Sequence, residues 1–345
     1  MSNIAEYCKN LKKDFTPRNK DTIKPVSAWS EKDLIEGKIT DTFVIIFNTT
    51  GCSWAKKSGC SMCGYFNDSS WKKITGEEIK SQFDNAMKRY KDQRFVKIFT
   101  SGSFLDECEI PTSARDYILK NLVKFTDKIS VESRPEYVTE NTIKEIKKIT
   151  KDKIFEIGIG LETADDEIRN KYINKGFTFK QYKKAAETLK KHDIKIKTYV
   201  LIKPPFLTEK ESIQDAVNTV KKIKNITDTI SFNPTNVQKN TYVNFLFKQR
   251  KYRPAWLHSV IEILKESKTT AKNVRIKCDV VGGGNIRGAH NCNECDREYL
   301  KAISDFSLNQ NTTIFEKLTC TCREKWLDQL ELENLGCASH INMYK

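Results

Sequence analysis

Thr42-Phe-Val-Ile-Ile-Phe47 is an apolar run of β-branched and aromatic residues, and it leads directly into a loop that carries three cysteines. The loop reads Asn48-Thr-Thr-Gly-Cys-Ser-Trp-Ala-Lys-Lys-Ser-Gly-Cys-Ser-Met-Cys-Gly-Tyr65. A run of this length and composition predicts a buried strand. Cys52, Cys60 and Cys63 would therefore follow the carboxyl end of that strand, on a loop whose glycines let the backbone fold closely around a bound group.

Three cysteines without an obvious fourth restrict what this loop can hold. A structural zinc site usually closes with four ligands, and a protein-held iron–sulfur cluster normally takes four cysteines. Three thiolates would leave one iron of a [4Fe–4S] cluster open, and an open iron can bind S-adenosylmethionine and cleave it reductively. The alternative is a zinc loop completed by a distant Cys or His. We therefore expect Cys52, Cys60 and Cys63 to hold a [4Fe–4S] cluster, with S-adenosylmethionine as its cofactor.

The rest of the chain alternates short β-branched or aromatic runs with amphipathic helical stretches as far as about Pro234. Expected strands are Phe43–Phe47, Phe95–Thr100, Lys128–Glu132, Ile154–Gly160, Ile196–Ile202 and Thr229–Phe232. Strands that alternate with helices predict an α/β fold with a parallel sheet, here a partial (β/α)6 barrel. We expect residues 1–40 to be a helical or irregular lead-in, 41–240 to be the barrel, and 241–345 to be a small C-terminal metal-binding segment.

The ends of these strands carry residues that could line a pocket beside the cysteine loop. The candidates are Tyr65, Ser101, Gly102, Ser103, Glu132, Arg134 and Glu162. Arg134 suits a carboxylate, because arginine binds carboxylates in a bidentate manner, and Glu132 suits a ribose hydroxyl. Taken singly, a charged residue at a strand end usually belongs to a solvated loop. Several such ends in one barrel favour a binding site, since chemistry in parallel sheets lies at the carboxyl ends of the strands.

A second group of cysteines lies near the C-terminus. Its members are Cys292, Cys295, Cys320 and Cys322, with His290 and Cys278 as possible replacements for one of them. Four thiolates are enough for a closed tetrahedral zinc site, which would be structural; a second iron–sulfur cluster is the alternative. The clustering of most of the 11 cysteines favours metals over a disulfide framework. Cys8, Cys108 and Cys337 stand alone and are expected to be ordinary apolar residues or free thiols.

The charge of the chain favours an extended anionic partner. Its 345 residues include 60 Lys and Arg against 45 Asp and Glu, a net charge of +15, which suits nucleic acid first. The alternative is a lysine-rich composition spread over solvated faces. Lys239–Arg253 interleaves basic and aromatic residues, as stacking on unpaired bases requires, although a connecting helix with its apolar face in the core would show the same pattern. With no spanning segment and no signal pattern, we expect a cytoplasmic protein without membrane contact.

Several of these motifs together resemble a known family. They are Gly51-Cys-Ser-Trp54, Gly59-Cys-Ser-Met-Cys-Gly-Tyr65, Glu132-Ser-Arg-Pro-Glu136 and Gly288-Ala-His-Asn-Cys292. The chain resembles the radical S-adenosylmethionine (radical SAM) superfamily, in the branch that contains the catalytic subunit of the elongator complex. Within that branch it is similar to the archaeal radical enzymes of archaeosine formation, from about Thr42 to Trp326.

The resemblance implies a C–N lyase that acts on tRNA. A partner, archaeosine synthase, attaches lysine to a nitrile-bearing deazaguanine in the D-loop, and the radical enzyme cleaves the C–N bond of that lysine to leave archaeosine. An electron donor is also implied. Ser101–Ser103 would contact the methionine amino group, although this loop lacks the acidic residue that many members place there. The alternatives are another radical modification of tRNA, and a zinc protein that binds RNA without catalysis.

Overall fold

The computed structural model of the protein describes residues 4–12 and 21–335. One eight-stranded sheet runs through it, with its strands side by side in chain order. Strand β1 pairs antiparallel with β2, and every later neighbour pairs in parallel. The strands are β1 Ser27–Ile35, β2 Lys38–Ile46, β3 Phe95–Phe99, β4 Lys128–Ser133, β5 Ile154–Glu162, β6 Lys195–Ile202, β7 Thr229–Pro234 and β8 Arg275–Cys278.

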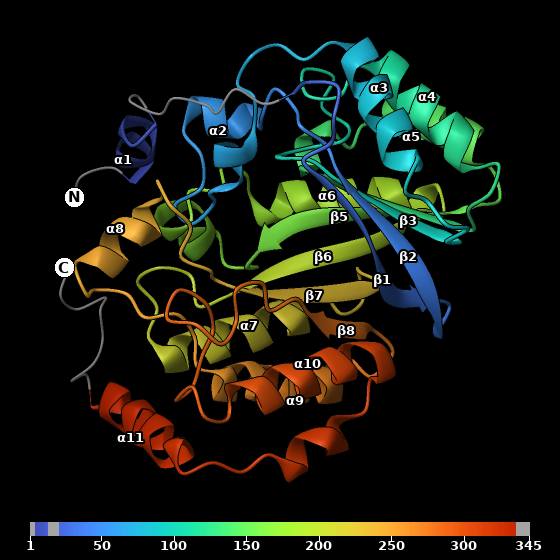
Figure 1. Ribbon diagram of the computed structural model, residues 1–345. Helices are drawn as coiled ribbons and strands as arrows, with labels where there is room; N and C mark the ends of the chain where they lie inside the picture. The colour runs from blue at the N-terminus through green and yellow to red at the C-terminus, as the bar shows by residue number, and fades with distance from the viewer. Residues whose placement is uncertain (1–3, 13–20, 336–345) are drawn as a thin grey trace.

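Helices cover the outside of the curved sheet (Figure 1). They are α1 Ile4–Asn10, α2 Ser53–Lys57, α3 Gly76–Met87, α4 Thr112–Leu122, α5 Glu140–Thr150, α6 Phe179–Lys191, α7 Glu209–Ile223, α8 Tyr242–Lys248, α9 Leu257–Thr270, α10 Asp296–Asn309 and α11 Cys322–Asn334. Thr75 and Thr178 begin α3 and α6 with capping boxes, which satisfy backbone N–H groups that would otherwise lack partners. None of the helices in the described residues is long and apolar enough to cross a membrane.

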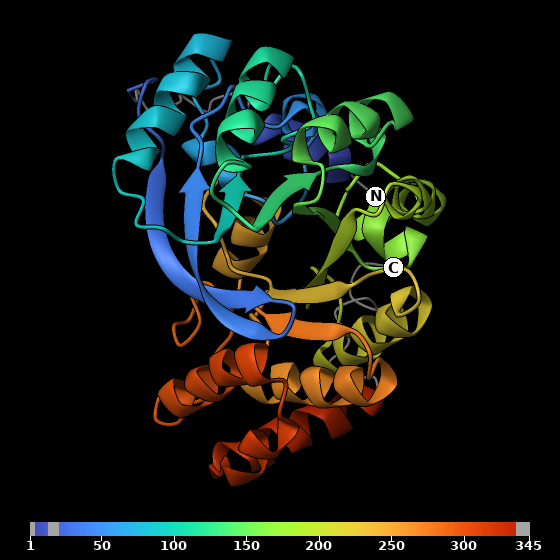
Figure 2. The same ribbon diagram turned by 90° about the vertical axis from the view of Figure 1, so that its right-hand side faces the viewer.

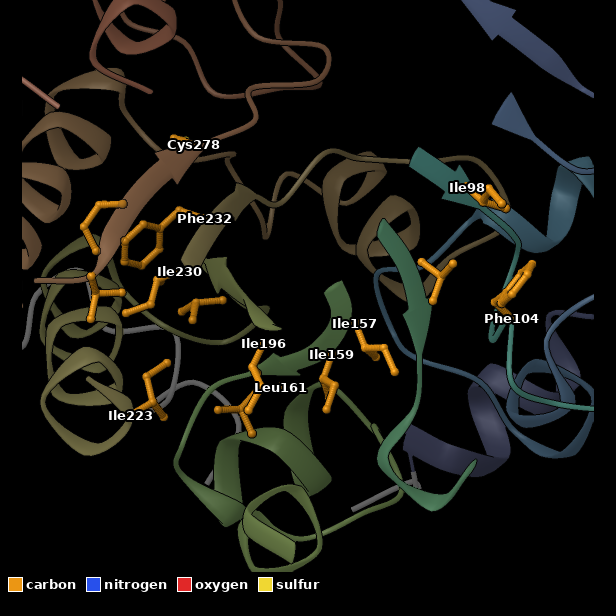
Figure 3. Close-up of a cluster of buried hydrophobic side chains, with 14 of the residues drawn as sticks. Ile98, Phe104, Ile157, Ile159, Leu161, Ile196, Ile223, Ile230, Phe232 and Cys278 are labelled. Carbon is orange, nitrogen blue, oxygen red and sulfur yellow. The ribbon is translucent and has the colours of Figure 1, made fainter. Parts of the chain in front are cut away.

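Residue alternation along each strand separates an apolar outer face from a polar inner face. On β5, Ile157, Ile159 and Leu161 are fully buried and pack toward the helices (Figure 3). The residues between them point into the barrel, where Glu156 bonds side chains of the neighbouring strands. Each fully buried isoleucine or leucine stabilises the fold by about 1.5–3 kcal/mol. The outer face therefore holds the helices, while the inner face is free to carry polar groups.

The predicted α/β partial barrel is confirmed, and its sheet has two strands more than the six expected of the barrel. The lead-in predicted to be helical or irregular contains β1, and β8 of the C-terminal segment extends the same sheet. The sequence of β1, Ser27-Ala-Trp-Ser-Glu-Lys-Asp-Leu-Ile35, looked like a polar loop. It forms a strand because the charged side chains on one of its faces pair with opposite charges inside the barrel. These ion pairs replace the hydration that the side chains would have in a loop.

Asp33 of β1 joins the two edges of this sheet. Its carboxylate accepts Arg275 Nη2 of β8 at 2.6 Å and also pairs with the buried Lys97 of β3. Figure 2 shows the β1–β2 hairpin curving round until its end lies beside β7 and β8. Burial alone would raise the pKa of Asp33, but Lys277, Lys97 and Arg275 outweigh it and hold that pKa well below its usual range. One ionised carboxylate thus links strands from opposite edges.

Replacing Asp33 by Asn should destabilise the protein strongly. The substitution keeps the shape but leaves buried cations without their partner, which costs about 3–5 kcal/mol. The control is Asp41→Asn on the same hairpin, whose ion pair with Lys32 is exposed and contributes less than about 1 kcal/mol. Urea unfolding measures both. The Asp33 effect should narrow as the pH falls below about 4, because Asp33 of the unfolded parent chain then binds a proton that the folded state, with its lowered pKa, does not bind. Equal losses for the two variants would contradict this role.

Candidate active site

The three cysteines of the first loop lie at the carboxyl end of β2, as predicted. Cys52 precedes α2, and a tight turn brings the Cys63 amide to the Cys60 carbonyl at 3.3 Å. Burial raises the pKa of Cys63 to about 12, and the negative charges of Cys60 and Cys52 act in the same direction. The three sulfurs therefore converge on one region in which a positively charged group would have to stabilise their thiolate forms.

Segments from distant parts of the chain hold this loop in place. Asn174 Nδ2 donates to the Gly59 carbonyl at 2.7 Å, and the Asn174 carbonyl accepts Trp54 Nε1 at 2.8 Å. From the turn after α1, Lys12 Nζ donates to the Ser58 carbonyl at 2.6 Å. From α8, the Val243 amide donates to the Ser61 carbonyl at 3.1 Å. Such a frame fixes the loop backbone before any ligand binds.

Gly102 brings the next predicted element directly against the first cysteine. A Cβ added at Gly102 would lie 2.7 Å from Cys52 Cβ and 2.6 Å from Glu109 Oε2, so no larger residue fits between them. Neighbouring Ser101 bonds Ser69 Oγ at 2.6 Å, and Ser103 Oγ accepts the Arg134 amide at 3.0 Å. The loop after β3 therefore lies beside the cysteines, where a small-residue loop could contact a shared ligand.

The Glu109 carboxylate holds the backbone of that loop. This residue was missed by sequence reasoning. Its carboxylate is fully buried and accepts the Gly102 amide at 3.0 Å, the Ser103 amide at 2.6 Å and Thr49 Oγ1 at 2.7 Å. Burial raises the pKa of Glu109 to about 7 against the lowering effect of these bonds. The loop itself lacks an acid, but Glu109 supplies one six residues after Ser103. The short acidic stretch Asp106-Glu-Cys-Glu109 was the available indication in the sequence.

Glu132 and Glu162 lie at neighbouring strand ends, and each contacts a partner that the sequence analysis did not name. Burial raises the pKa of Glu132, against the lowering effect of a hydrogen bond from Tyr199. Glu162 pairs with Lys175 Nζ at 2.5 Å and has a left-handed φ of 67° beside a break in the β5–β6 register. Lys175 also lies near Cys60. Burial lowers the pKa of Lys175, but the negative charges of Glu162 and Cys60 outweigh burial and raise that pKa.

Tyr65 and Arg134 complete the predicted set. Tyr65 begins a short 3-10 turn, Tyr65–Asp68, and is 56% exposed. Desolvation of its hydroxyl by the surrounding protein atoms raises the pKa of Tyr65, and the negative charges of Cys63 and Glu132 raise it further. Arg134 is buried, donates from Nε to Glu136 at 2.5 Å, and lies over the rings of Trp54 and Phe177 at 5.3 and 5.4 Å. The seven candidates thus belong to one side of the barrel, around its mouth.

The second group of cysteines forms a compact site. Cys292, Cys295, Cys320 and Cys322 bring all their sulfurs within 4.8 Å of one another. Cys292 and Cys320 are 3.6 Å apart, and Cys295 and Cys322 are 3.7 Å apart. Four thiolates at about 2.3 Å from one zinc ion would be separated by about 3.8 Å in a tetrahedron. The geometry therefore fits a single tetrahedral ion and is too small for a four-iron cluster.

Neither His290 nor Cys278 belongs to that compact group. The additional neighbour is His258 of α9, whose Nε2 lies 3.3 Å from Cys322 Sγ. Burial lowers the pKa of His258 to about 4, so that its neutral ring can donate to the sulfur. Sequence reasoning missed His258 because it lies 64 positions before the cysteine. Of the isolated cysteines, Cys8 is buried and Cys108 exposed, and Cys337 lies outside the described residues.

Cys52, Cys60 and Cys63 do not form a comparably compact group in the part of the chain that the structure describes. A family model described as the radical SAM superfamily matches residues 47–220. The chain belongs to the radical SAM superfamily. The family implies a [4Fe–4S] cluster and S-adenosylmethionine, and the three separated thiols beside Gly102 suit both groups.

Two curated relatives match most of this radical SAM protein. The archaeosine synthase subunit beta of Methanosarcina acetivorans is 41% identical over 342 residues, which cover 98% of each chain. The subunit of the same name from Thermococcus kodakarensis is 39% identical over 305 residues, covering 86% of this chain and 94% of that protein. Among solved structures, Methanocaldococcus infernus Elp3 is 15% identical, with a TM-score of 0.48 over 67% of this chain and 59% of its own.

Glu109→Gln should weaken the binding of S-adenosylmethionine. An amide can accept on one side only, so its NH2 group would face a backbone donor and leave that donor unsatisfied, which costs about 1–3 kcal/mol. We expect about a tenfold higher Kd by anaerobic calorimetry, with unchanged iron content. The control is Glu107→Gln in the same loop, which loses only a bond from Thr112 Oγ1. A variant that binds like the parent would show that Glu109 does not order the loop.

Cys320→Ser should remove the ion from the four-cysteine site. We expect the parent protein to contain about one zinc ion per chain besides its iron, and the variant to lose the zinc and unfold at lower temperature, because metal binding contributes to folding. Elemental analysis and thermal unfolding measure both effects. Cys108→Ser, at an exposed cysteine, serves as the control. Retention of zinc by the Cys320 variant would exclude the four-thiolate site.

Proposed function

We propose that this radical SAM protein forms archaeosine in tRNA by cleaving the C–N bond of a lysine that a partner enzyme, archaeosine synthase, has attached to a deazaguanine of the D-loop. The observation that carries the proposal is the 41% identity to archaeosine synthase subunit beta over 98% of both chains. A match that extends over the barrel and the C-terminal segment alike supports a shared substrate as well as a shared cofactor.

The residues at the mouth have separate tasks in this proposal. When bound, the cluster and S-adenosylmethionine would supply a carbon radical that abstracts hydrogen from the lysine ε-carbon. Cys52, Cys60 and Cys63 would hold the cluster, and the loop Ser101–Ser103 would bind the methionine amino group. Glu132, fixed by Tyr199, would bind the ribose. Arg134 would bind the carboxylate, since its guanidinium lies close enough to Cys52 to oppose the rise that burial causes in the pKa of that thiol.

The C-terminal site has a structural role in the proposal. We assign zinc to the four cysteines, because a single tetrahedral ion fits their spacing. The site connects the start of α10 at Cys295 with the start of α11 at Cys322. It therefore braces the C-terminal helices and leaves the chemistry to the barrel mouth.

The decisive experiment supplies tRNA that carries the lysine adduct. The protein is reconstituted anaerobically with iron and sulfide, reduced, and mixed with S-adenosylmethionine and this tRNA. We expect 5′-deoxyadenosine and archaeosine to accumulate together, Cys60→Ala to abolish both, and the exposed Cys108→Ala to leave both unchanged. Product analysis is by mass spectrometry of digested tRNA.

Other outcomes would point to other functions. Cleavage of S-adenosylmethionine with no archaeosine from adduct-bearing tRNA would favour a different radical modification of tRNA. A colourless protein that contains zinc but no iron and cleaves nothing would overturn the radical chemistry and leave an RNA-binding zinc protein.

A further inference from the structure

The segment around α8 carries charge of one sign. Residues 236–253 contain five cationic side chains and no Asp or Glu. Four of the cations, Lys239, Lys248, Arg250 and Lys251, are exposed. The chain as a whole has 45 acidic residues in 345 positions, so a stretch of 18 without one is a local concentration of positive charge. Such a surface suits a polyanion.

Burial in the core accounts for the apolar residues on only one face of α8. Val243 and Leu246 are buried in a small apolar cluster with Val237 and Tyr252, as expected for a connecting helix. Phe245 lies on another face and is 39% exposed. Its ring is stacked on Tyr242, with centroids 5.9 Å apart and planes at 23°. The ring also contacts Tyr7 of α1, with centroids 5.3 Å apart, yet these contacts still leave it exposed among the exposed cations.

This surface adjoins the cysteine loop. The Val243 amide bonds the Ser61 carbonyl at 3.1 Å, and Asn67 Nδ2 donates to the Lys239 carbonyl at 2.9 Å. Gln238 accepts the Gly64 amide directly after the third cysteine. Figure 1 shows α8 on the same side of the molecule as α2, at the end of the barrel toward which β5 points. A macromolecule bound to α8 would therefore lie against the mouth.

We propose that Lys239, Lys248, Arg250 and Phe245 form a docking surface for the tRNA, with the cations on phosphates and the Phe245 ring stacked on an unpaired base. The inference rests on the proposed function, which makes tRNA the substrate of the adjoining site. An RNA loop suits this surface better than a duplex does, because only splayed bases can reach an aromatic ring. The surface also helps to explain how a nucleotide inside folded tRNA is brought to the barrel mouth.

Binding of a tRNA transcript to the anaerobically reconstituted full chain tests the surface. Fluorescence anisotropy over a series of salt concentrations gives the affinity and its salt dependence. The triple variant Lys239→Gln, Lys248→Gln, Arg250→Gln should bind tRNA more weakly. The negative slope of log K against log salt should become shallower by about 2–3, because each phosphate contact contributes about 0.7–0.9 to its magnitude. The matched control, Lys144→Gln, Lys148→Gln, Lys151→Gln, removes three exposed cations from α5 and its C-terminal end and should keep the slope.

Phe245 provides a second, independent readout. Phe245→Ala should weaken tRNA binding about tenfold with no change in salt slope, and Phe245→Trp should restore it, because base stacking needs an aromatic ring and no charge. Parent-like binding by both the triple and the Phe245→Ala variants would overturn the surface, even if archaeosine still forms. Variants that bind a protein partner more weakly but bind tRNA like the parent would also overturn the proposed tRNA docking surface. Tight tRNA binding without archaeosine formation would contradict the proposed function alone.

Discussion

The ion pairs of Asp33 are the constraint on which the barrel depends. The sheet is open, with β1 at one edge and β8 at the other, and no ladder of backbone hydrogen bonds joins these two strands. A buried carboxylate that contacts Arg275 and Lys97 takes the place of such a ladder. The desolvation of each ion costs several kcal/mol, so the arrangement persists only because several opposite charges surround Asp33.

This constraint also determines the character of the interior. Closed barrels of the (β/α)8 type fill their centre with layers of branched apolar side chains. Here the inward positions of β4, β5 and β6 carry Lys128, Glu156 and Lys197, which pair with one another. Deeply buried charges disfavour an apolar core inside, and the large apolar cluster lies on the outer face beneath the helices. The polar interior that remains suits a charged cofactor such as S-adenosylmethionine.

The sequence predicted those features that local pattern or composition determines. The apolar run that forms β5 and the two groups of cysteines are properties of neighbouring residues. Strand β1 was missed because its inward Glu31 and Asp33 look like loop residues until Lys97, more than 60 positions away, is placed beside them. Glu109, Lys175 and His258 were missed for the same reason: each acts through a contact that only the folded chain creates.

The two groups of cysteines differ in spacing, and that difference separates their roles. Four sulfurs in near contact can close around one ion, while three separated sulfurs leave room for a larger group with an open position. The closed site lies at the starts of α10 and α11, and α10 in turn packs on β8, where Ser307 Oγ accepts the Cys278 amide at 3.0 Å. Strand β8 presents Arg275 to Asp33. A metal bound by the four cysteines would thus support the edge of the sheet that completes the barrel.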